Sequence, residues 1–147
     1  MAEITRKEII LALMASGGSP RLAGIDLSEL NLSFLDLHSS NFYRTNLSGA
    51  NLNGANLDDA NLYRANLSEC QLSAAVLRGA DLRRSILRGA SLRGASLRGT
   101  DLRGANLSEA AVNLSQIVQA LLDENTIMPD ESNYTSPNGH TLEESSQ

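Results

Sequence analysis

Residues 50–69 read ANLNG ANLDD ANLYR ANLSE, which is one five-residue unit repeated without interruption. The same register extends in both directions: Leu stands at every fifth position from Leu22 to Leu107, and Phe42 takes the one remaining place. Two residues before each of these centres the chain usually has a small residue, most often Ala, and one residue before it usually has Asn or Asp. An internal repeat this regular has to be interpreted before any single residue, because it decides the fold class.

A five-residue period fits neither an α-helix nor a flat strand. On a helix successive centres rotate by about 140° and never form one stripe, and along a strand they alternate between the two faces. Within a unit the small residue and the Leu are two apart, so a three-residue extended piece points both inward and the Asn or Asp outward. The remaining two residues form a corner, where Gly adopts backbone angles that other residues resist. Such pieces wind into coils that stack at about 4.8 Å, so the sequence predicts an all-β repeat, a β-solenoid.

The repeat units resemble the pentapeptide-repeat family over residues 20–109. The units that carry the resemblance are ANLNG from Ala50, ANLDD from Ala55, ADLRR from Ala80 and ASLRG from Ala90. The resemblance implies a right-handed quadrilateral β-helix with four repeats per turn, in which the central Leu or Phe and the small residue fill the interior. The ends of the chain are similar to those of small cyanobacterial-type members, which carry short α-helical caps at both ends.

The N-terminal part, residues 1–19, is expected to be a capping helix in front of the solenoid at 20–109. Thr5 and Glu8 have the spacing of a capping box, an apolar face follows, and Gly17 is a typical helix end. In the first coil the small positions hold large residues, so we expect a wider coil against which the helix packs. These residues are Ile25, Leu30 and Leu35.

The C-terminal part is expected to cap the other end, because a bare last coil would expose a Leu layer and an unpaired strand edge. Residues 110–129 are predicted to form a helical cap, with a helix that begins at Ser115 and ends near Asn125 and Pro129. Its apolar face would comprise Ile117, Val118, Leu121 and Leu122. Residues 130–147 are polar and acidic and are predicted to be a disordered tail.

Composition and motifs argue against an enzyme. His38 has no catalytic partner at a suitable spacing, the Ser residues have no adjacent base, and a solenoid with every side chain packed or exposed offers no cavity for chemistry. Cys70 is the single Cys and replaces an inward Ala, so it should be a buried, inert thiol. We expect no metal, no cofactor and no membrane span, and a cytoplasmic monomer rather than a dimer.

One face of the predicted solenoid differs from the other three. If four repeats make a turn, residues twenty apart stack, and the face behind Phe42 and Leu62 carries two outer columns. The first column is Tyr43, Tyr63, Arg83 and Arg103, and the second is Arg44, Arg64, Arg84 and Gly104. Like charges stacked across strands are destabilising by a few tenths of a kcal/mol each, so stability alone would not choose this arrangement. We define the Arg/Tyr strip, the candidate interaction face, as Tyr43, Arg44, Tyr63, Arg64, Arg83, Arg84 and Arg103.

The strip has more than one interpretation. It can bind an acidic protein partner, or it can be a solvated face on which Arg side chains lie over Tyr rings and pair with Asp81 and Asp101. Nucleic acid is the alternative partner, through direct phosphate contacts of the Arg residues. Some pentapeptide-repeat proteins inhibit type II topoisomerases by DNA mimicry, but that form needs acidic faces and this one is rich in Arg. The sequence therefore favours a non-enzymatic protein-interaction module whose partner is an unidentified, acidic protein.

Overall fold

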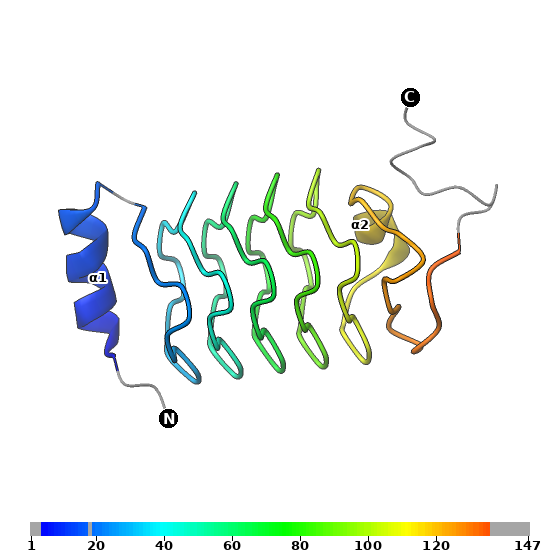
Figure 1. The fold of residues 1–147 in the computed structure, drawn as a ribbon, viewed down its shortest axis with the longest axis horizontal. Coiled ribbons are helices and arrows are strands. Elements are labelled where there is room, and N and C mark those ends of the chain that lie inside the picture. The colour runs from blue at the N-terminus through cyan, green and yellow to red at the C-terminus, as the bar shows by residue number, and fades with distance from the viewer. Residues whose placement is uncertain (1–3, 18, 136–147) are drawn as a thin grey trace.

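The computed structural model describes residues 4–17 and 19–135 as a row of stacked coils, with one helix at the N-terminal end and a short helix near the C-terminal end (Figure 1). The helices are α1, Arg6–Ala15, and α2, Leu114–Ile117. Parallel bridges join residues twenty apart, from Arg21↔Asn41 at the start to Asp101↔Leu121 near the end. Each turn of the coil therefore contains four five-residue repeats, as the resemblance implied. The architecture is a β-solenoid, as the repeat pattern predicted.

The repeat geometry follows the inward and outward pattern read from the sequence. The central Leu62 and the small residue Ala65 are both fully buried. The Leu62 N–H donates to the Asp81 carbonyl of the next coil at 2.8 Å, and the Ala65 N–H donates back to the Leu62 carbonyl at 3.0 Å, which closes the corner. The coils thus bury their central and small inward residues inside the stack and pair their backbone groups with those of neighbouring coils.

Cys70 occupies one of the small inward positions, as predicted. Its side chain is 1% exposed, and its thiol donates to the Leu47 carbonyl at 2.7 Å. Burial raises the pKa of the Cys70 thiol to about 12, so the reactive thiolate is scarce at neutral pH.

Helix α1 lies against the first coil (Figure 1). The capping box is present: Thr5 Oγ1 accepts from the Glu8 N–H, and Glu8 Oε2 accepts from the Thr5 N–H, both at 3.2 Å. Ile9 is fully buried, and the Arg6 guanidinium donates to the Asn31 carbonyl at 2.8 Å. The large residues of the first coil are partly buried and pack against the core: Ile25, Leu30 and Leu35.

The predicted C-terminal helix is wrong in its extent. Helix α2 has four residues and is capped by Asn113, whereas Leu121 returns to the coil and Val118 is 63% exposed. The Leu121 N–H donates to the Thr100 carbonyl, and the Leu121 carbonyl accepts from the Leu102 N–H, each at 2.8 Å. The backbone edge of the last complete coil pairs with one more coil segment, and this outweighs the local helical pattern.

The predicted disorder from residue 130 is wrong for residues 130–135. Asn133 forms an antiparallel bridge with Ile127, and the Tyr134 N–H donates to the Thr126 carbonyl at 2.9 Å. The Tyr134 side chain is partly buried and packs against the core, which gives this short segment an apolar anchor. Residues 136–147, the rest of the predicted tail, lie outside the described residues.

Candidate interaction face

The coil stacking brings the residues of the Arg/Tyr strip together in neighbouring coils on one face. The Arg44 N–H donates to the Tyr63 carbonyl at 3.1 Å, and the Arg64 N–H donates to the Arg83 carbonyl at 3.0 Å. The Tyr43 and Tyr63 rings stack with their centroids 5.8 Å apart and their planes 14° from parallel. The backbone spacing of a solenoid therefore gives the two outer columns that the sequence register predicts.

In the first column the Arg residues are paired within the strip's own coils. Arg83 Nε and Nη2 lie 2.9 and 2.8 Å from the two carboxylate oxygens of Asp81. Arg103 makes the same forked contact with Asp101, at 2.9 and 2.7 Å. The hydrogen bonds from Arg83 lower the pKa of Asp81 from its usual value, so this carboxylate stays ionised to more acidic pH. The charges of this column are neutralised at short range.

In the second column the Arg residues have no carboxylate partner among the residues that the structure describes. The guanidinium carbon of Arg44 lies 5.4 Å from the Tyr43 ring centroid, and that of Arg64 lies 5.5 Å from the Tyr63 ring centroid. Within residues 4–17 and 19–135, Arg44, Arg64 and Arg84 form no ion pair. All three side chains are exposed. The contacts of the solvated-face interpretation are thus present in both columns, as Arg–Asp pairs in the first and as Arg–Tyr contacts in the second. The Tyr contacts leave the positive charge of the second column in place.

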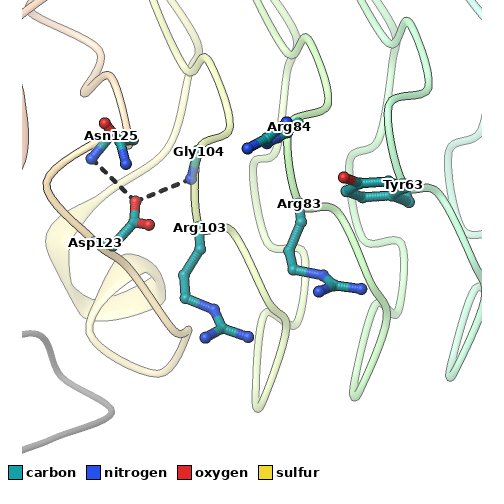
Figure 2. Close-up of a pocket in the computed structure, with 7 residues that line it drawn as sticks. All are labelled: Tyr63, Arg83, Arg84, Arg103, Gly104, Asp123 and Asn125. Atoms are coloured by element: carbon teal, nitrogen blue, oxygen red, sulfur yellow. Dashed lines mark hydrogen bonds between the residues drawn. The ribbon is translucent and has the colours of Figure 1, made fainter.

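The strip ends in an open cleft of about 460 Å³ at the C-terminal end of the face (Figure 2). Gly104 stands where the second column would continue, and a Cβ atom at this position would lie 3.2 Å from Cγ of Arg84. Asp123 closes the far wall, because its Oδ1 accepts from the N–H groups of Gly104 and Asn125 at 3.0 Å each. The cleft residues are Tyr63, Arg83, Arg84, Arg103, Gly104, Asp123 and Asn125. Asp123 and Asn125 line the cleft but are not among the site residues predicted from the sequence. The register could have indicated Asp123, because it is twenty residues after Arg103 and continues the first column.

A His–Asp contact lies on the surface of the solenoid. His38 Nδ1 lies 2.7 Å from Asp36 Oδ1, but both side chains are largely exposed and no nucleophile is paired with them. Across residues 4–17 and 19–135 there is no cluster of three His, Cys, Asp or Glu side chains suited to a metal ion. In the same ranges no helix has the length and apolar character needed to cross a membrane.

Comparison with known proteins identifies the fold. The family model for pentapeptide repeats matches residues 40–79 and 75–111, with eight copies of the repeat. A pentapeptide repeat protein from Nostoc PCC 7120, alr5209, is 32% identical to this chain and superimposes on it with a TM-score of 0.67. The match covers 81% of this chain and 96% of alr5209. This chain belongs to the pentapeptide-repeat family.

Two further solved structures give weaker superpositions. The pentapeptide repeat protein Rfr23 from Cyanothece 51142 is 33% identical over 71% of this chain and 64% of its own, with a TM-score of 0.37. QnrB1, a plasmid-mediated fluoroquinolone resistance protein, is 16% identical over 71% of this chain and 60% of its own, with a TM-score of 0.34. A search of curated proteins gave no match.

Proposed function

We propose that this pentapeptide-repeat protein is a non-enzymatic interaction module that presents one face of its solenoid to an acidic protein, and that the Arg/Tyr strip is that face. One observation carries the proposal: Arg44, Arg64 and Arg84 occupy the same corner of successive coils, are exposed, and have no carboxylate partner in the described chain. In the proposed arrangement the solenoid is right-handed, with residues 1–19 closing one end and residues 110–129 the other.

The chemistry of the strip suits carboxylates. A guanidinium presents a planar fork of N–H donors that matches a carboxylate, and an Arg held over an aromatic ring loses less freedom when it binds. The stacked rings of Tyr43 and Tyr63 add a rigid apolar surface beside Arg44 and Arg64. A rigid repeat scaffold fixes these groups in place before the partner arrives, which reduces the entropy lost on binding.

Nucleic acid is the second candidate partner, because the same unpaired Arg residues can contact phosphates. Mimicry of DNA toward a topoisomerase has less support, since it would require an acidic strip and the unpaired charges here are positive. Direct phosphate binding would show a strong dependence on salt, as each phosphate contact releases counterions.

The test is affinity capture from a soluble lysate with three baits, each with and without nuclease. One bait is the intact protein. The strip variant carries Arg44→Glu, Arg64→Glu and Arg84→Glu. The control variant has the same change in charge on the other faces, at Arg88→Glu, Arg93→Glu and Arg98→Glu. We expect a protein that resists nuclease, is held by the intact and control baits, and is lost from the strip variant. Recovery of the same proteins by all three baits would refute the strip as the contact face, and a signal that nuclease abolishes would assign nucleic acid instead.

A further inference from the structure

The charged corners of the solenoid are arranged in two different ways. At one corner Glu alternates with Gly along successive coils, in the order Glu29, Gly49, Glu69, Gly89 and Glu109. A Cβ atom at Gly49 would lie 3.3 Å from Cγ of Glu29, so each Gly leaves room for the Glu of the preceding coil to lie across it. Like charges at this corner are therefore two coils apart, about 9.6 Å at the usual inter-strand spacing.

At the corner that carries Arg44, Arg64 and Arg84, like charges stand in three successive coils. Their spacing is about 4.8 Å, well inside the Debye length of about 8 Å at physiological ionic strength. The backbone at these positions is also unfavourable for a residue with a side chain, since φ is 56°, 59° and 56°. The Arg residues of this corner do not alternate with Gly, and none of them has a carboxylate partner in the described part of the chain. The corner therefore suits an external anion. We call these three residues the Arg corner.

The spacing of the three Arg residues can be compared with the spacing of carboxylates on an acidic helix and on an acidic strand. From the first Arg to the third the distance along the stack is about 9.6 Å at the usual inter-strand spacing. Along an α-helix, residues i and i+7 are about 10.5 Å apart, and residues i+3 or i+4 fall between them on the same face. Along an extended strand, three residues on one face span about 13.6 Å. A helix therefore matches the corner to within about 1 Å, and a strand misses by about 4 Å.

We infer that the Arg corner binds an acidic α-helix that lies along the solenoid axis and presents carboxylates at positions i, i+3 or i+4, and i+7. Arg44 and Arg64, held over Tyr43 and Tyr63, meet the first two carboxylates, and Arg84 meets the third. Arg83 and Arg103 do not take part, because they are already paired with Asp81 and Asp101. This inference rests on the proposed function and narrows it from an acidic protein to one presenting an acidic helix.

The experiment measures the binding of synthetic peptides to the full chain by fluorescence anisotropy. The first peptide is an Ala-rich helix with Glu at i, i+4 and i+7 on one face. The second has the same composition with the three Glu distributed around the helix, and the third is an extended acidic peptide broken by Pro. A single-stranded oligonucleotide is the fourth probe. The proteins are the intact chain, the variant Arg44→Gln, Arg64→Gln, Arg84→Gln, and the control Arg88→Gln, Arg93→Gln, Arg98→Gln.

We expect the one-face helix to bind the intact and control proteins at least about tenfold more tightly than the distributed helix, a difference of about 1.4 kcal/mol. The variant of the Arg corner should lose this difference. Equal affinity for the two helices, tighter binding of the extended peptide or the oligonucleotide, or an equal loss in the control would each overturn the inference. If lysate capture still depends on the strip after such a result, only the helical shape of the partner is refuted. If capture does not depend on the strip, the proposed function falls as well.

Discussion

Replacing Arg84 by Gly should stabilise the protein, although it removes a large side chain. Arg84 has φ of 56°, a left-handed conformation that costs a residue with a Cβ atom about 1–2 kcal/mol. Gly removes that strain but loses about 0.5–1 kcal/mol more conformational freedom on folding. Arg84 forms no ion pair in the described chain, and the next residue of its column, Gly104, is already Gly with φ of 73°. The two ranges leave a net increase of about 0–1.5 kcal/mol in the free energy of unfolding, with a midpoint of about 0.75 kcal/mol.

The matched control is Arg84→Ala, which removes the same charge but keeps a Cβ atom at positive φ. Urea unfolding followed by far-UV circular dichroism would give the free energy of unfolding of both variants. Thermal unfolding should show a rise of about 2–5 °C in the midpoint for Arg84→Gly. If Arg84→Ala stabilises the protein as much as Arg84→Gly, the gain comes from relieved repulsion within the Arg corner, and the strain argument is refuted. A destabilised Arg84→Gly protein would refute both explanations.

Three further predictions concern the core, pH and the thiol. Leu62→Ala should lower the free energy of unfolding by about 2–5 kcal/mol, because it opens a cavity in a fully buried layer. Leu62→Met should lower it by less than about 1.5 kcal/mol, and urea unfolding of both variants would measure the difference. The pKa of Asp81 in the folded protein is below its usual value, so the Asp81 carboxylate stabilises the fold fully above the usual pKa, and this stabilisation is lost as pH falls through the folded pKa. From pH 7 to pH 3 the intact protein should therefore lose more free energy of unfolding than the Asp81→Asn variant, and equal losses would contradict this. Cys70 should react with a thiol reagent at pH 8 only after denaturation, and rapid labelling of the native protein would contradict its burial.

The coil could be predicted from the sequence because period, residue size and residue polarity all agree within each unit. Leu62 as a centre, Ala65 as a small neighbour and Cys70 as a substitute for Ala all lie where the five-residue register places them. The structure of the C-terminal segment was harder to predict, because Ile117 and Leu122 fit two patterns. They lie on one face of a possible helix, and they also continue the five-residue register beyond Leu107. The structure follows the register at Leu122, because an unpaired coil edge needs backbone partners that a helix cannot supply.

The membership of the strip could also be predicted, but the division of its charges could not. The twenty-residue stacking depends only on the number of repeats per turn, so both columns follow from counting. The two residues after a centre, such as Arg83 and Arg84 after Leu82, form the corner. Which of them can reach Asp81 depends on the direction of its side chain, and the register does not specify that direction. The structure shows that Arg83, directly after its centre, reaches Asp81, whereas Arg84, one residue further on, lies beside Gly104 (Figure 2).

The Arg corner combines two features that each oppose stability. Left-handed backbone alone is no indication of function, because Glu29 and Glu69 share it, with φ of 60° and 58°. Arg44, Arg64 and Arg84 differ from these Glu residues because backbone strain and like charge occur together in successive coils. Gly at any of the three positions would relieve both the strain and the repulsion there. If the strip binds an acidic partner, substitutions that increase stability at this corner should reduce affinity. Stability and binding would then change in opposite directions at the same residues, a relation that a merely solvated face has no reason to show.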